Sequence, residues 1–135
     1  MTAQRGFTYL SVLLAMALLG IGIAAASEVW VTTARRQRME QLQWVGQQYV
    51  QAIGSYYEDS PGRSKAYPAA LQDLLEDRRF AFTRRHLRQA YVNPFSGAAD
   101  WEPVRAAGGG IRGVRVAVPD TTGRTFAYEF SYTPR

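Results

Sequence analysis

The sequence predicts an α+β fold in which a long amino-terminal helix carries a short helix and a small antiparallel β-sheet on its second half. Three observations lead to this prediction. The chain has no charged residue from Phe7 to Ala26 and no proline from there to Tyr57. Its last part, after Gly110, alternates apolar and polar side chains around a Pro-Asp-Thr-Thr-Gly turn, a pattern typical of half-buried strands.

The uncharged run from Phe7 to Ala26 predicts a membrane-spanning helix. At 1.5 Å per residue, roughly twenty residues extend about 30 Å, the thickness of the hydrocarbon core of a bilayer. A helix satisfies its own backbone hydrogen bonds, which lipid cannot do. Two alternatives remain. One is a buried core helix, and the other is a cleaved secretory signal that uses the small residues Ala24, Ala25 and Ala26 as its cleavage site.

A short leader precedes the apolar run. Residues 1–6 read MTAQRG, with Arg5 as the only charged side chain, and Gly6 opens directly into Phe7 and Thr8. This arrangement resembles the prepilins of type IV pili and the pseudopilins of type II secretion. The resemblance implies cleavage by a prepilin peptidase between Gly6 and Phe7, N-methylation of the new terminus at Phe7, and retention of the apolar helix. A glycine at this point lets an extended peptide approach a tight active site.

Ser11 departs from the family pattern, which usually has a glutamate at the fifth residue of the mature chain. In the family, that carboxylate is thought to neutralise the terminal ammonium of a neighbouring subunit, because an unpaired charge inside the membrane costs several kcal/mol. Family members without the glutamate tend to be minor subunits at the filament tip. Ser11 therefore favours a tip or other minor subunit. The alternative is a subunit that tolerates weaker docking.

The resemblance also implies partners, a location and a packing surface. The partners are other pilin or pseudopilin subunits, the prepilin peptidase, an inner-membrane assembly platform and the lipid bilayer. The location is the bacterial inner membrane, as a single-pass protein with its amino terminus cytoplasmic and its globular part periplasmic, and then a periplasmic filament. The residues expected to pack in the filament core are Leu10, Ser11, Leu14, Leu18, Gly20 and Gly22.

The distribution of basic residues conflicts with this orientation. Arg5 alone precedes the apolar run, whereas Arg35, Arg36 and Arg38 follow it. Counted alone, the positive-inside rule points the carboxyl-terminal part toward the cytoplasm. We retain the orientation implied by the leader, and the conflict stays open.

Beyond the apolar run, the pattern predicts that the same helix continues as an amphipathic one over residues 28–57. Its apolar residues recur at spacings of three, four and seven, which places them on one helix face. The members of this face are Val31, Ala34, Leu42, Val45, Tyr49, Ala52, Ile53 and Tyr56. The expected organisation is thus a leader at 1–6, a membrane or filament-core helix at 7–27, its amphipathic continuation at 28–57, and a small globular part at 58–135.

The globular part begins with a predicted short helix from Ala69 to Asp77, opened by a Tyr-Pro pair. A turn is expected at Asn93, since Asn-Pro favours turn initiation, with Gly97 closing it. The glycines before Ile111 mark another turn. A short apolar stretch around Val104 precedes them.

Two longer strands are expected at the end of the chain. Ile111 to Val118 carries valines on one face, and Arg124 to Thr133 carries aromatic residues on one face. The amphipathic helix is the expected partner of that aromatic face. Carbohydrate binding is the alternative use of the aromatic stripe. The members of the stripe are Phe126, Tyr128, Phe130 and Tyr132.

The most basic stretch is residues 78–88. Its arginines and phenylalanines are compatible with binding to nucleic acid or anionic lipid, which would suit a DNA-binding or adhesive minor pilin. The favoured interpretation pairs the arginines with nearby acids and packs Phe80, Phe82 and Leu87 inward, so nucleic acid is not a favoured partner. His86, the only histidine, is expected to be structural. The arginines of the possible anion-binding patch are Arg78, Arg79, Arg84, Arg85 and Arg88.

Composition and motifs favour a non-enzymatic protein without a cofactor. The net charge is +5, 20% of residues are charged and 47% are hydrophobic, which describes a folded chain. With no cysteine there is neither a disulfide framework nor a thiolate metal site. No phosphate-binding loop and no nucleophile elbow are present. Calcium is not expected either, because Asp120 is the only carboxylate in its loop.

Overall fold

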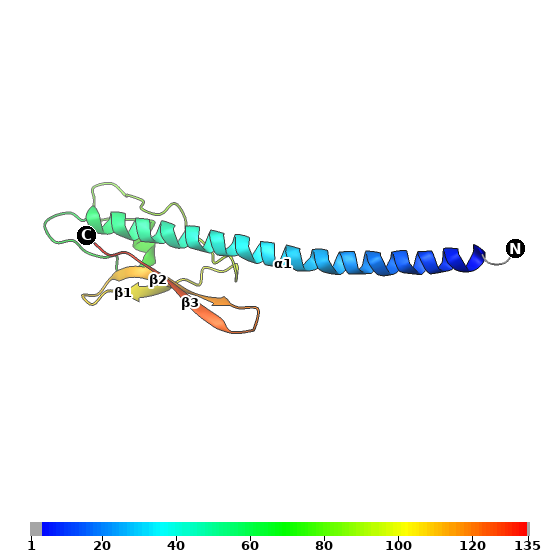
Figure 1. Cartoon of the computed structure of the whole chain (residues 1–135). Coiled ribbons are helices and arrows are strands. Elements are labelled where there is room, and N and C mark those ends of the chain that lie inside the picture. Colours follow the sequence, from blue (N-terminus) through cyan, green and yellow to red (C-terminus); the bar gives the residue numbers. More distant parts are fainter. Residues whose placement is uncertain (1–3, 135) are drawn as a thin grey trace. The chain divides into compact units, whose positions relative to one another are not determined.

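The computed structural model describes residues 4–134, and it describes side-chain surroundings for residues 7–21 and 30–134. The chain divides into two compact units, Met1–Gln37 and Arg38–Arg135, which are described separately. The prediction of an α+β protein with a small antiparallel sheet is confirmed. The elements are α1 (Gln4–Glu58), the 3₁₀ helix η1 (Leu71–Leu74), β1 (Glu102–Arg105), β2 (Ile111–Pro119) and β3 (Thr125–Ser131) (Figure 1).

The first unit contains only the amino-terminal part of α1. Its large apolar side chains from Phe7 to Ile21 are exposed in the single chain. Within the described ranges, no helical window reaches the length and apolarity needed to cross a membrane. Leucine, methionine and alanine favour the helical conformation of this part, whereas Gly20 weakens it locally.

In the second unit, α1 presents one apolar face to the core. Spacings of three and four residues place these side chains in line, as the sequence predicts for this part of the helix. The buried members of the face are Leu42, Val45, Tyr49, Ala52, Ile53 and Tyr56. They form one cluster with Leu74, Leu87, Trp101 and the valines of β2.

The three strands form an antiparallel sheet in the order β1-β2-β3. In the central strand, Val114, Val116 and Val118 are buried and the residues between them are exposed, which confirms the predicted alternation. Val116 lies opposite Tyr128 of β3. The register of β1 shifts between Val104 and Arg105, where its short pairing with β2 ends.

Two glycines of α1 let β3 approach the helix closely. A Cβ at Gly46 would lie 2.5 Å from the ring of Phe130, and one at Gly54 would lie 2.8 Å from the ring of Tyr132. These two aromatic residues thus pack on the helix as predicted. Phe126 does not, because it is 50% exposed at the turn end of the β2–β3 hairpin, which diverges from α1 in Figure 1.

The short helix is shorter than the predicted Ala69–Asp77. The carboxylate of Asp73 accepts hydrogen bonds from the backbone N–H groups of Ala69 and Ala70, which fixes the start of η1. At the other end, the N–H of Asp77 donates to the carbonyl of Arg84 rather than to a helical acceptor. This long-range pairing takes the donor that a continuing helix would need.

The turn predicted at Asn93 is present. The N–H of Gly97 donates to the carbonyl of Asn93, and the side chain of Asn93 accepts from the N–H of Phe95. Gly97 has φ of 72°, a conformation that glycine adopts without strain. Asn93 is fully buried, and two residues before it the carbonyl of Tyr91 accepts a hydrogen bond from Nε1 of Trp101.

Candidate functional site

The residues expected at the processing site lie near the start of α1. Gly6 is helical, but its surroundings fall outside the described side chains. Phe7 is 75% exposed. Among the described residues, none covers Phe7, the residue that follows the expected cleavage site.

The residues expected to pack in a filament core form an exposed surface on the first unit. Leu10, Leu14 and Leu18 are each more than half exposed, and no atom lies within 4 Å of where a Cβ at Gly20 would stand. Gly22 lies outside the described side chains. We call residues 7–21 the apolar segment, and its leucines are available for contact with lipid or with other chains.

Ser11 satisfies its hydroxyl within the helix. Its Oγ donates to the carbonyl of Thr8 at 2.9 Å. A hydroxyl bonded in this way adds no charge to the apolar segment. The position can therefore pack against an apolar neighbour without leaving a donor unpaired.

The arginine-rich stretch 78–88 is mostly neutralised by acids. Arg78 pairs with Glu76 at 2.9 Å, Arg79 with Asp77 at 2.8 Å, and Arg84 with Asp59 at 3.5 Å. Arg85 and Arg88 have no ion pair among the described residues. Of the three apolar side chains expected to pack inward, Leu87 is buried and Phe80 is half-buried, but Phe82 is 71% exposed, so the prediction is wrong for Phe82.

The ion pair of Asp77 and Arg79 links this stretch to α1. Arg79 donates to Asp77 through its backbone N–H and through its guanidinium. The guanidinium also donates to the carbonyl of Tyr56 and lies 3.5 Å from the centre of its ring. The hydrogen bonds that the Asp77 carboxylate accepts, above all those from the Arg79 side chain, lower its pKa from 3.8 to about 2. Burial acts in the opposite direction and raises the pKa.

The depressed pKa makes a prediction for acid stability. A carboxylate whose pKa falls on folding stabilises the fold above its unfolded pKa, and that contribution disappears as the pH drops toward the folded value. From pH 5 to pH 2 the chain should lose ~2 kcal/mol of unfolding free energy through this group alone, given the shift from 3.8 to about 2. Unfolding of the chain and of Asp77→Asn at both pH values tests this. Parallel losses in the two chains would contradict it.

Asp77 also belongs to a Ser–His–Asp hydrogen-bond network that no sequence motif indicates. Nε2 of His86 lies 3.1 Å from the Asp77 carboxylate, and Nδ1 lies 2.9 Å from Oγ of Ser55. The carboxylate only accepts, so Nε2 donates to it, and Nδ1 shares a hydrogen bond with Oγ of Ser55, which also donates to the Asp59 carboxylate at 3.5 Å. Ser55 comes from α1, Asp77 from the backbone bridge with Arg84, and His86 from the segment that follows that bridge. Because 31 residues separate Ser55 from His86, no local sequence pattern indicates this network.

The geometry of the Ser55–His86–Asp77 network suits a structural contact better than a catalytic site. Ser55 lies inside α1, whose N–H groups are used by the helix itself, so no pair of free donors can stabilise an oxyanion beside it. Asp77 is already held by Arg79, and the His86 side chain is only 3% exposed. The His86 contacts instead close the loop onto α1.

The described residues give little support for a metal site or for a small-molecule site beside η1. They hold no group of three or more histidine or acidic side chains placed to bind a metal ion. Asp120 accepts hydrogen bonds from the hydroxyls of Thr121 and Thr122. A hollow of about 680 Å³ between Tyr56 and η1 contains Asp73 and Asp77, whose oxygens already serve the contacts described above.

Two surfaces thus stand out in the described parts of the chain: the apolar segment 7–21, and the loop that exposes Phe82 beside Arg85 and Arg88. Comparison with family models, with curated proteins and with solved structures found no match.

Proposed function

We propose that this protein is a non-enzymatic structural subunit, a pseudopilin or minor pilin, of a periplasmic filament in type II secretion or a related pilus machine. One observation carries the proposal. An uncharged apolar helix follows a six-residue leader that ends in Gly6, and its described side chains from Phe7 to Ile21 are exposed in the single chain. The α+β unit on the later part of α1 supports the proposal, because a sheet laid on a long helix is the expected globular half of such a subunit.

In the proposed mechanism, the apolar helix has two successive environments. Before assembly, residues 7–27 lie in the inner membrane, with Phe7 at the cytoplasmic face after cleavage. During assembly, the helices of neighbouring subunits pack together, so that each leaves lipid without exposing its leucines to water. Covering apolar area is worth roughly 25 cal/mol per Å², which holds the filament together once an external machine has extracted the helix.

Ser11 refines the proposed position in the filament. A subunit that has a neighbour above it needs a partner for that neighbour's terminal ammonium inside the apolar core. Ser11 carries no charge, and its hydroxyl donates a hydrogen bond to the carbonyl of Thr8. We therefore assign the chain to the tip or to another minor position.

A second candidate function, DNA binding by the arginine-rich stretch, has one observation in its favour. Arg85 and Arg88 have no acidic partner among the described residues, and Phe82 beside them is exposed. A phosphate-binding surface built on two arginines would show an affinity for duplex DNA that falls as salt rises. Binding of the full chain at two salt concentrations tests this, and the absence of salt-dependent affinity removes the candidate.

Replacing Gly6 by valine tests the proposed processing. A side chain at this position should block entry of the leader into prepilin peptidase, so the chain accumulates with its leader attached in a host that contains the enzyme. Gly20→Val is the matched control, since Gly20 lies in the same helix and no atom crowds it. Cleavage followed on gels should be lost only in Gly6→Val. Equal cleavage of both variants would contradict the proposal.

A further inference from the structure

A groove between α1 and β3 has features of a ligand site that the proposed function does not use. Its volume is about 640 Å³, within the range of about 300 to 1,000 Å³ that is usual for ligand pockets. Two aromatic side chains, Trp44 and Phe130, form its apolar part. Polar side chains supply the rest, namely Glu40, Gln43, Gln47, Gln48 and Gln51.

Trp44 presents a fixed aromatic surface in this groove. It is 53% exposed, although tryptophan is on average a highly buried residue. Its ring lies 5.4 Å from the ring of Tyr91 in an edge-to-face contact, with an angle of 89° between the two planes. Tyr91 in turn packs edge to face against the buried Tyr49. The Trp44 ring is thus held in place before any ligand binds, so little conformational freedom is lost on binding.

The glutamines form a row of neutral hydrogen-bonding groups beside that ring. Gln43, Gln47 and Gln51 are spaced by four residues, which places them in line along about 12 Å of the helix. All three are exposed, and Gln48 is half-buried. Each amide has two N–H donors and an acceptor oxygen. Within the described part of the chain no hydrogen bond engages these amides, so they are available to a ligand.

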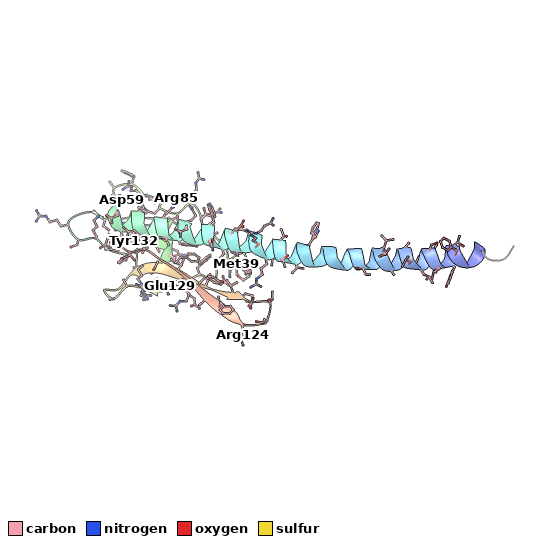
Figure 2. All side chains as sticks on the ribbon, in the orientation of Figure 1. Met39, Asp59, Arg85, Arg124, Glu129 and Tyr132 are labelled. Atoms are coloured by element: carbon pink, nitrogen blue, oxygen red, sulfur yellow. The ribbon has the colours of Figure 1, made fainter. Side chains whose placement is uncertain are left out.

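The described lining of the groove has no basic residue, and its one carboxylate, Glu40, already has an interaction of its own within the chain. Figure 2 shows Arg85 on the opposite side of α1 from Glu129 of β3, so the arginine-rich stretch lies away from the groove. A nucleic acid or an acidic ligand would need cationic partners here. A hydrophobic peptide helix would need a wider apolar surface than two rings provide.

We propose that this groove binds a neutral oligosaccharide. A sugar ring has a face of C–H groups and a rim of hydroxyls, so it fits a site that combines an exposed aromatic ring with planar amides. Trp44 stacks on the apolar face of one sugar ring, and Phe130 closes the groove on the side of β3. The amides of Gln43, Gln47 and Gln51 donate to and accept from hydroxyls. Because this row extends along the helix, it suits several linked sugars better than a single one.

The groove is a different site from the aromatic stripe of β3. Of that stripe only Phe130 lines the groove, because Tyr132 packs on Gly54 and Phe126 lies at the turn end of the hairpin. The helix α1 supplies Trp44 and all the glutamines. This inference goes beyond the proposed function and does not depend on it, since it concerns the second unit alone and holds whether or not the amino terminus is processed.

Calorimetric titration of the full chain with chitohexaose and with cellohexaose tests the proposal. The chain is kept in a detergent without a sugar headgroup, since such a headgroup would compete for the groove. We expect saturable binding. Binding of chitohexaose alone would identify a glycan of N-acetylated amino sugars, as in the bacterial cell wall, and binding of cellohexaose as well would identify a glucan. If neither oligosaccharide binds, the proposal is wrong.

Two variants with matched controls locate the binding in the groove. Trp44→Ala removes the stacking surface and should lower the affinity about tenfold, whereas Trp30→Ala truncates an exposed tryptophan outside the groove and should not change it. Gln47→Leu changes an exposed side chain that the fold does not need and should lower the affinity about fivefold. Gln89→Leu, also exposed, should leave it unchanged. Binding that survives both groove variants, or that falls equally in the controls, would overturn the assignment.

Discussion

Replacing Asp77 by asparagine should lower the free energy of unfolding by about 3 kcal/mol. Asp77 is 1% exposed and accepts hydrogen bonds from Arg79 and His86. Asparagine has nearly the same shape but no charge, and its amide would turn a donor toward the Arg79 guanidinium. Removing one member of a buried ion pair costs about 3 to 5 kcal/mol. The lower value applies because the Arg79 side chain is 23% exposed and can recover some hydration.

Urea unfolding of the full chain in detergent measures this loss, with tryptophan fluorescence as the signal, since Trp101 is the buried one of the three tryptophans and becomes exposed on unfolding. Glu76→Gln provides the matched control. Glu76 pairs with Arg78 in the same loop, but both side chains are more than half exposed. Such a pair contributes less than about 1 kcal/mol. If the two variants were equally stable, Asp77 would not fasten the loop to α1.

Replacing Gly113 by alanine should cost about 3 kcal/mol, at the upper end of overpacking effects. A Cβ at Gly113 would lie 2.3 Å from the carbonyl oxygen of Phe130 and 2.7 Å from Cα of Ser131. Both are backbone atoms of β3, which is held in register by its ladder with β2. Relief therefore requires the two strands to separate, and that movement would also pull Phe130 away from Gly46 of α1.

Gly108→Ala is the control for this substitution. No atom lies within 4 Å of where its Cβ would stand, so the same change should alter stability by less than about 0.5 kcal/mol. Urea unfolding of both variants gives the comparison. A Gly113→Ala chain as stable as Gly108→Ala would mean that β2 and β3 are further apart than described.

Local periodicity explains which parts of the fold the sequence could predict. The apolar face of α1 from Leu42 to Tyr56 and the buried valines of β2 follow from helical and strand spacing, since each is a property of one continuous segment. The turn at Asn93 follows from the residues of the turn itself. In these cases no distant residue decides the outcome.

Long-range contacts explain what the sequence could not predict. The short helix stops early because the N–H of Asp77 pairs with Arg84. Phe82 is exposed in the loop that the backbone pairing of Asp77 with Arg84 closes. The Ser55–His86–Asp77 hydrogen-bond network joins α1 to both sides of the Asp77–Arg84 bridge, and no spacing in the sequence indicates it.

The amino terminus of the mature chain tests the central proposal most directly. The chain is purified from the membranes of a host that contains prepilin peptidase, and its intact mass and first residue are determined by mass spectrometry. The proposal predicts a chain that begins at N-methylated Phe7 and keeps the whole apolar helix. A mature chain that begins near Ser27, or one that still begins at Met1 in the presence of the enzyme, would contradict it.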